Sequence, residues 1–263
     1  METVQRAVIV LLAASGCGRF GFDASAPDAA QEPDADVEAV QPCAGGPPSA
    51  DLLAWYRFEL PDTTIDWSGA GLDGNCGDEL TCPLPAEGAL GGGLQFQRSR
   101  QDRLRVRGPL DLSGDFTAMG WVFLQPAAML GSRTIAAKML GADDSNTVQF
   151  GIREGGGLFI SLDSLAGRNT EEIAESVAEQ TWSHVAVAYS PGSSTAFVWL
   201  NGVRISTLPG IEVDVDDGPL LLGADLDADI VNDTMNGVLD DLRFYRRLVS
   251  DSEVAALVAC AGL

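Results

Sequence analysis

The sequence predicts an all-β domain, a sandwich of antiparallel strands with one short C-terminal helix. Short runs of alternating apolar and polar residues recur along the chain, separated by Gly, Asp, Asn and Ser. Asn201-Gly202 lies between two such runs and indicates a hairpin turn, because both residues tolerate positive φ. Ser250 and Glu253 form a capping box before an apolar run, which predicts the final helix.

The expected strands follow one another along most of the chain after residue 51. They span residues 52–58, 103–107, 115–124, 134–138, 147–152, 157–162, 182–189, 196–201, 203–207, 219–223 and 235–245. The segment 171–179 is ambiguous and could form a helical turn. The acidic run Asp225, Asp227 and Asp229 is expected in a loop before the last strand. The many short strands without an internal repeat are typical of a sandwich or jelly roll.

Seven sequence fragments between residues 51 and 260 occur in a specific order. They are Leu53-Ala-Trp-Tyr-Arg-Phe, Asp66-Trp-Ser-Gly, Gly92-Gly-Leu-Gln-Phe, Phe116-Thr-Ala-Met-Gly-Trp-Val, Trp182-Ser-His-Val-Ala-Val-Ala-Tyr, Asn201-Gly and Gly237-Val-Leu-Asp-Asp-Leu-Arg-Phe-Tyr. The series resembles the LamG-like jelly-roll family of the concanavalin A-like lectin/glucanase superfamily. The resemblance implies a concanavalin A-like jelly-roll sandwich of two antiparallel sheets over residues 51–260. It implies no single activity, because a fold does not determine function.

The composition excludes several classes of partner and chemistry. Acidic residues number 38 against 16 basic ones, so the formal net charge is −22. A field of this sign repels nucleic acid and anionic lipid, and neither is expected as a direct partner. The single histidine, His184, leaves little material for a zinc enzyme or for serine–histidine catalysis. Within its strand we expect His184 to be packed and hydrogen-bonded.

The N-terminal segment predicts export. Arg6 precedes an apolar run over residues 7–14, which is too short to span a bilayer but suits a signal peptide. The following Ser15-Gly16-Cys17 resembles the lipobox of bacterial lipoproteins. We therefore expect a signal peptide over 1–16 and acylation of Cys17, which would anchor the protein in the cell envelope, at the outer membrane. The alternative is an ordinary signal peptide with an incidental cysteine.

Residues 17–50 and the remaining cysteines complete the expected organisation. The segment 17–50 is rich in Ala, Asp and Pro and predicts a disordered tether. Apart from Cys17, the chain has four cysteines, an even number that suits an oxidising compartment. We expect Cys76–Cys82 to close a small loop and Cys43–Cys260 to join the two ends of the domain.

One acidic segment resembles the catalytic strand of some glycanases in the spacing of its carboxylates. Glu212, Asp214 and Asp216 alternate, so a strand there would place them on one face. Glycanases of the same superfamily carry Glu-x-Asp-x-x-Glu on a strand, with two glutamates as nucleophile and acid/base. Here the last position is Asp217, and no aromatic residue accompanies the run. We interpret the segment as a solvated edge and predict no catalytic residues.

The last predicted strand indicates a possible calcium site. Alternation places Asp240 on the same face as Val238, Leu242 and Phe244, where its charge requires compensation. Asp66 begins a turn-rich loop that can offer carbonyl oxygens to calcium. Members of the family that the chain resembles often hold such an ion, so we expect a structural Ca²⁺ with Asp66 and Asp240 as ligands. Alternatively, backbone N–H groups or an arginine satisfy Asp240.

The acidic run at Asp225 and the tryptophans are the remaining candidates for ligand or metal binding. The run at Asp225 is interpreted as a solvated loop that could supply further ligands to an ion. Of the five tryptophans only Trp67 lies in a loop, whereas the others lie within strands, where core packing explains them. The sequence predicts a non-catalytic binding or adhesion module for a carbohydrate or protein ligand. The alternatives are a carbohydrate-active enzyme of the same fold and a structural envelope protein.

Overall fold

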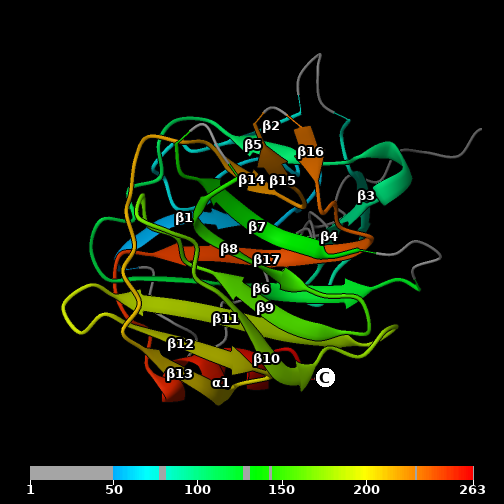
Figure 1. The fold of residues 1–263 in the computed structure, drawn as a ribbon. Coiled ribbons are helices and arrows are strands. Elements are labelled where there is room, and N and C mark those ends of the chain that lie inside the picture. Colours follow the sequence, from blue (N-terminus) through cyan, green and yellow to red (C-terminus); the bar gives the residue numbers. More distant parts are fainter. Residues whose placement is uncertain (1–49, 77–80, 127–130, 142–143, 229, 263) are drawn as a thin grey trace, which may run out of the picture. The chain divides into compact units, whose positions relative to one another are not determined.

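The computed structural model describes five stretches of the chain. They are residues 50–76, 81–126, 131–141, 144–228 and 230–262. The signal peptide expected over 1–16, all but the last residue of the tether expected over 17–50, Cys17, Cys43 and Asp229 lie outside these stretches. The described elements form two large antiparallel sheets and one helix, as the sequence predicts (Figure 1).

The first sheet has eight strands in the order β13-β12-β11-β6-β17-β4-β3, with β1 paired to β17. Its strands are β1 (Leu52–Tyr56), β3 (Leu84–Glu87), β4 (Gly92–Phe96), β6 (Phe116–Leu124), β11 (Trp182–Ser190), β12 (Thr195–Leu200), β13 (Val203–Pro209) and β17 (Gly237–Tyr245). Asn201 and Gly202 join β12 to β13 with positive φ at both residues, which confirms the predicted hairpin turn.

The second sheet has seven strands in the order β10-β9-β8-β7-β14-β5-β2. Its strands are β2 (Gly74–Asn75), β5 (Leu104–Val106), β7 (Arg133–Met139), β8 (Asn146–Ile152), β9 (Gly157–Ser161), β10 (Thr170–Ser176) and β14 (Leu220–Leu222). A short 3-10 helix, η1 (Arg98–Arg100), precedes β5. The ambiguous segment at 171–179 is mostly strand β10, because its backbone pairs with β9 at the sheet edge.

Apolar side chains fill the space between the two sheets. The large aromatic residues of this core are Tyr56, Phe58, Phe96, Phe116, Phe150, Tyr189 and Phe244, all essentially buried. A second apolar cluster, which includes Trp121 and Trp199, contains the buried residues Val254 and Leu257 of helix α1 (Asp251–Cys260). Figure 1 shows α1 beside β12 and β13. Ser250 caps the helix in the predicted capping box with Glu253.

A β-bulge in β17 changes which residues share a face with Asp240. The pairing of β17 with β6 is irregular between Asp240 and Arg243, and Asp241 has a φ of 50°. The extra residue shifts the alternation. Leu242 and Phe244 therefore point into the core between the sheets, whereas Asp240 pairs with Trp121 of the second cluster. The prediction that Asp240 shares a face with Leu242 and Phe244 was wrong for this reason.

The acidic run before β17 is a hairpin and not a loop. Strands β15 (Asp225–Asp227) and β16 (Ile230–Asn232) pair with each other, and β15 lies against β7. Asp225 is 3% exposed, so the expectation of a solvated loop was wrong at this residue. The hairpin lies against β7 of the second sheet, and this contact buries the carboxylate of Asp225. Nothing in the local sequence predicts that burial.

One predicted disulfide is present in the described residues. Cys76 and Cys82 are bonded, with their Cα atoms 5.1 Å apart, and close a small loop next to β2. Cys260 at the end of α1 is also disulfide-bonded. Its predicted partner Cys43 lies outside the described residues, so that pairing stays a prediction. No helix in the described part of the chain is long and apolar enough to cross a membrane.

Candidate metal centre

Three carboxylates from separate parts of the sequence meet at one place, here called the acidic centre. Asp144 lies in the turn before β8, whereas Asp225 and Asp227 are the first and last residues of β15. One carboxylate oxygen from each of the three lies within 4.8 Å of the others. Residues two apart on a strand share a face, so β15 presents both of its carboxylates to Asp144.

The protein satisfies these carboxylates only in part. Asp225 Oδ1 accepts a hydrogen bond from the amide of Leu226 at 2.8 Å, and its Oδ2 accepts one from Asn146 Nδ2 at 3.2 Å. Asp227 Oδ2 accepts one from Asn232 Nδ2 at 2.5 Å. The buried Oδ1 of Asp227 has no hydrogen-bond partner among the described residues.

The electrostatics of the acidic centre favour a bound positive charge. Burial raises the pKa of Asp225 above its ordinary value. Burial and the neighbouring Asp144 carboxylate likewise raise the pKa of Asp227, to about 7, whereas the proximity of Asp227, together with Arg168, lowers the pKa of Asp144. Like charges at this separation disfavour full ionisation, and Asp227 is the member of the pair that keeps its proton toward neutral pH. A divalent cation would replace that proton and compensate all three carboxylates.

Asn146 lies beside Asp225, with its side-chain nitrogen turned toward the carboxylate. Its side chain is 1% exposed and its Oδ1 has no partner in the part of the chain that the structure describes. Its backbone amide is fixed by a 2.8 Å hydrogen bond to Asp163 Oδ2. An amide can exchange its oxygen and nitrogen by a half rotation, which would turn Oδ1 toward Asp225. Two facing oxygens repel each other unless a cation lies between them.

This donor set suits calcium better than a transition metal. All the candidate ligands are oxygens, and calcium takes about six to eight oxygen ligands in flexible geometry. The three carboxylates and Asn146 account for part of such a shell. Carbonyl groups, water or a ligand would supply the rest, so a bound ion could contact a ligand directly.

Asp144 is the residue of the acidic centre that the sequence analysis missed. It lies three residues before the strand predicted at 147–152, and Asp225 lies two residues after the strand predicted at 219–223. In the structure β7 pairs with both β8 and β14, which brings these two strand ends into one region of the second sheet. The sequence does contain a signal for the acidic centre, because carboxylates lie next to the ends of two predicted strands. To recognise that they meet, one must also know the order of the strands in the sheet.

The predicted metal ligand Asp66 is engaged by protein donors. Its Oδ1 accepts hydrogen bonds from the amides of Trp55 and Ser68, both at 2.9 Å. Its Oδ2 accepts from Ser68 Oγ at 2.9 Å and from the amide of Leu72 at 3.0 Å. Burial raises the pKa of Asp66, but these hydrogen bonds outweigh it and hold the pKa below its ordinary value. Asp66 therefore fixes the loop after residue 66 onto β1.

The other predicted ligand, Asp240, lies in different surroundings. It is fully buried, its Oδ2 accepts a 2.8 Å hydrogen bond from the amide of Leu90, and its Oδ1 has no partner among the described residues. Burial raises its pKa to about 8. Neither Asp66 nor Asp240 belongs to the acidic centre. A calcium ion shared by Asp66 and Asp240 stays a prediction. The acidic centre is an alternative site and brings three carboxylates together.

The segment compared with glycanase strands has another structure. Residues 211–219 form no strand, so the expected one-face arrangement of Glu212, Asp214 and Asp216 is absent. Asp214 accepts a hydrogen bond from the amide of Leu165 at 2.8 Å. Asp216 accepts from two loop amides and lies 3.7 Å from the buried Nζ of Lys138. Asp214 is exposed and the side chain of Asp216 is 38% exposed, as a solvated edge requires, and both carboxylates also hold loops together.

His184, Trp121 and Trp199 are buried as expected, whereas Trp55 and Trp182 are only half-buried in their strands. His184 is fully buried against Trp121, with ring centroids 5.2 Å apart, and burial lowers its pKa to about 3. Neither ring nitrogen has a hydrogen-bond partner in the described residues, so the predicted hydrogen bonding was wrong. Trp67 is 47% exposed in its loop, and the guanidinium of Arg57 lies 5.0 Å from its ring.

Comparison with protein families gave one match. A model described as the concanavalin A-like lectin/glucanases superfamily matches residues 98–255, which include the three members of the acidic centre. No curated protein gave a significant match to the chain.

Solved structures share the fold at low sequence identity. Domain 4 of AbnA, an extracellular arabinanase from Geobacillus stearothermophilus solved with arabinotriose, is 18% identical with a TM-score of 0.63, over 79% of this chain and 98% of that domain. The binding domain of Paraclostridial Mosquitocidal Protein 1 is 16% identical with a TM-score of 0.61, over 80% and 52%. The binding domain of botulinum neurotoxin DC, solved with rat synaptotagmin II, is 12% identical with a TM-score of 0.58, over 81% and 52%. This chain therefore spans about half the length of the toxin binding domains it matches.

Proposed function

This chain belongs to the concanavalin A-like lectin/glucanases superfamily, and we propose that it is a non-catalytic, calcium-dependent carbohydrate-binding domain. The observation that carries the proposal is the acidic centre at Asp144, Asp225 and Asp227, three carboxylates within 4.8 Å of one another. Their charge has little compensation from the protein, because Arg168 is the only cation that forms an ion pair with them among the described residues.

A bound calcium ion would give the domain a direct contact for a sugar. Calcium accepts hydroxyl oxygens into its flexible shell, and a vicinal diol offers two of them at once. The protein ligands at the acidic centre leave positions in that shell for a ligand. Among proteins of the same fold, one is solved with arabinotriose and another with synaptotagmin. These two complexes support ligand binding, and a protein ligand is the alternative that the experiment below includes.

The N-terminal sequence supports export and display. We propose that residues 1–16 direct export, that Cys17 carries the lipid, and that residues 17–50 tether the domain to the envelope. Such a tether would let the domain reach ligands at a distance from the membrane. The net charge of −22 disfavours contact between the domain and anionic lipid, so the lipid would be the only attachment to the membrane.

The experiment compares ligand binding with and without calcium. The purified protein is applied to a glycan array and to a panel of surface proteins, in calcium and after removal of divalent ions. A parallel screen measures hydrolysis of the same glycans. We expect binding to a subset of glycans that requires calcium, with no release of products.

Two variants assign that binding to the acidic centre. Asp225→Asn should abolish it, because the substitution removes one charge while it keeps the size of the side chain. Glu154→Gln removes a charge in the exposed turn between β8 and β9 and should leave binding unchanged. Binding in Asp225→Asn equal to wild type, binding of proteins alone, or hydrolysis of a glycan would each contradict the proposal.

A further inference from the structure

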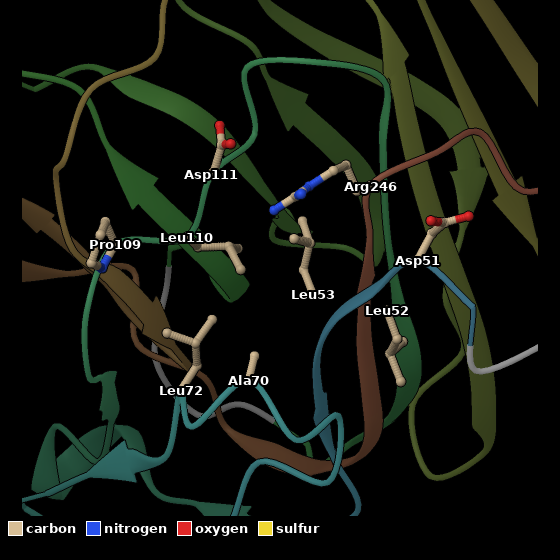
Figure 2. A pocket seen from close by; sticks show the side chains of 9 residues that line it. All are labelled: Asp51, Leu52, Leu53, Ala70, Leu72, Pro109, Leu110, Asp111 and Arg246. Carbon is tan, nitrogen blue, oxygen red and sulfur yellow. The ribbon is translucent and has the colours of Figure 1, made fainter.

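A pocket of about 340 Å³ lies on the domain and shares no residue with the acidic centre (Figure 2). It is formed where the start of β1, the loop before β2, the loop after β5 and the residue after β17 meet. Its lining residues are Asp51, Leu52, Leu53, Ala70, Leu72, Pro109, Leu110, Asp111 and Arg246. Pockets of roughly 300 to 1,000 Å³ are typical of small-molecule sites, so this one can hold about one sugar ring.

The floor of the pocket is aliphatic. Leu53 and Leu110 are buried, whereas Leu52 and Leu72 are half-buried. Figure 2 shows Leu53, Leu72 and Leu110 around a common space. None of the lining residues is aromatic. The floor therefore offers contact for C–H groups but no ring on which a neutral sugar could stack, so affinity must come from the polar rim.

Arg246 is the only cation that lines the pocket. Figure 2 shows its side chain extending over the floor, with the guanidinium between Asp111 and Leu53. Arg246 makes no ion pair with any described residue, although eight other arginines do. Hydrogen bonds from Ser113 and, to a smaller degree, the charge of Arg246 lower the pKa of Asp111 on the same rim. No carboxylate of the described residues lies within ion-pair distance of the guanidinium, so its donors are available for an anionic ligand.

Asp51 and Asp111 give the rim two acceptors. Both side chains are exposed and line the same pocket as Arg246. Carboxylates accept hydrogen bonds from hydroxyl groups, and neither of them can bind an anion. The rim thus combines one forked donor for a carboxylate with two acceptors for hydroxyl groups.

The walls of the pocket are fixed before any ligand binds. Leu72 donates its amide to Asp66 Oδ2 at 3.0 Å and accepts a 2.6 Å hydrogen bond from Tyr56 Oη at its carbonyl. The amide of Arg246 donates to the carbonyl of Asp51 at 2.8 Å, which joins two sides of the rim. A pre-formed site loses less conformational entropy on binding. Asp66, predicted to bind calcium, here supports a wall of the pocket.

We infer that this pocket binds a sugar acid, a pyranose ring that carries one carboxylate. The carboxylate pairs with the guanidinium of Arg246 through two parallel hydrogen bonds. Ring hydroxyl groups donate to Asp51 and Asp111, and the C–H face of the ring lies on the leucine floor. This site is independent of the acidic centre and needs no metal ion. It goes beyond the proposed function because it names a second site and a second ligand class.

The test titrates the protein with glucuronate, glucose and alanine in buffer stripped of divalent ions. Without calcium the acidic centre does not contribute, so the failure of one proposal does not decide the other. Calorimetry and amide NMR shifts report binding and its location. We expect saturable binding of glucuronate, shifts at the pocket residues, and little binding of glucose, which lacks the carboxylate.

Three variants locate the site. Arg246→Ala should weaken glucuronate binding at least about tenfold, since hydrogen bonds between charged groups contribute more than neutral ones. Arg246→Lys should bind with intermediate affinity, because it keeps the charge but loses the fork. Ala70→Phe, at an exposed position of the rim, should block the pocket. The matched control Arg105→Ala removes an exposed arginine outside the pocket and should bind as wild type does.

Four results would overturn the inference. They are absence of saturable glucuronate binding, equal binding of glucose, unchanged binding in Arg246→Ala, and an equal loss in Arg105→Ala. Tighter binding of alanine than of glucuronate would assign the pocket to amino acids and would also overturn it. All the substituted side chains are exposed, so circular dichroism should show the wild-type fold in each variant.

Discussion

Replacing Asp240 by asparagine should make the stability of the domain less dependent on pH. Asp240 is fully buried in β17, and burial raises its pKa from the ordinary 3.8 to about 8. In the folded protein the carboxyl group therefore keeps its proton up to about pH 8, whereas in the unfolded chain it ionises near pH 4. Between these values the folded state binds one more proton than the unfolded state.

The sign and size of the effect follow from that difference. A group with a raised pKa in the folded state gives stability that is complete below the unfolded pKa and is lost as pH rises to the folded pKa. The loss is about 1.4 kcal/mol per pH unit, or about 4 kcal/mol between about pH 5 and pH 8. Asparagine is neutral throughout, and its oxygen can still accept the hydrogen bond from the amide of Leu90.

Urea unfolding of wild type and Asp240→Asn at both pH values measures the effect. The new NH₂ group takes the place of Oδ1, which has no partner among the described residues, so it lowers the free energy of unfolding. This cost is the same at both pH values and cancels when they are compared. The variant should gain about 4 kcal/mol relative to wild type at the higher pH. A pH-independent difference would refute the reasoning. If calcium bound Asp240, the carboxylate would be ionised and the variant would instead lose stability when calcium is present.

Three further predictions concern the ends of the domain. Ser250→Ala removes the cap of α1 and should lower the free energy of unfolding by about 1 kcal/mol, measured by urea denaturation; no change would mean that the helix end is held in another way. Mass spectrometry of the native protein should find an acylated Cys17 as the mature N-terminus, and cleavage elsewhere would contradict the lipoprotein hypothesis. Non-reducing peptide mapping should recover Cys43 linked to Cys260, and a peptide that joins Cys260 to another cysteine would refute the pairing.

Much of the fold could be predicted because strand signals are local. The alternating runs at β6 and β11 and the Asn201-Gly202 turn each carry their structure within about ten residues. The capping box at Ser250 is local in the same sense. Segment 171–179 lacks such a signal, since only Ile173 and Val177 are buried there, and only its pairing with β9 makes most of it a strand.

The faces of β17 could not be predicted because a bulge is a tertiary feature. Strict alternation assigns Leu242 to the face of Asp240, and a single residue with positive φ, Asp241, reverses that assignment. Asp241 is held by Arg243, 2.9 Å from its Oδ2, and by Trp55 Nε1 at 2.5 Å. Arg243 lies on the same strand, but Trp55 belongs to β1, so the sequence around Asp241 alone does not supply both contacts.

The candidate site required the strand order for a similar reason. Asp144 and Asp225 are separated by the whole of β8 to β14, and pairing through β7 brings them together. The sequence correctly singled out the acidic run at Asp225, but it placed the run in a solvated loop. Asp66 was singled out for its turn-rich loop, and its four hydrogen bonds from protein donors show that the loop uses this carboxylate internally.

Calorimetric titration of Ca²⁺ into the metal-free protein tests the central claim most directly. We expect one saturable site per molecule, with a Kd of about 0.1 to 1 mM as in other extracellular modules. The site should be absent from Asp225→Asn and retained in Glu154→Gln. Calcium binding that is unchanged in Asp225→Asn but lost in Asp240→Asn would place the ion elsewhere, and absence of saturable binding in wild type would contradict a calcium-dependent domain.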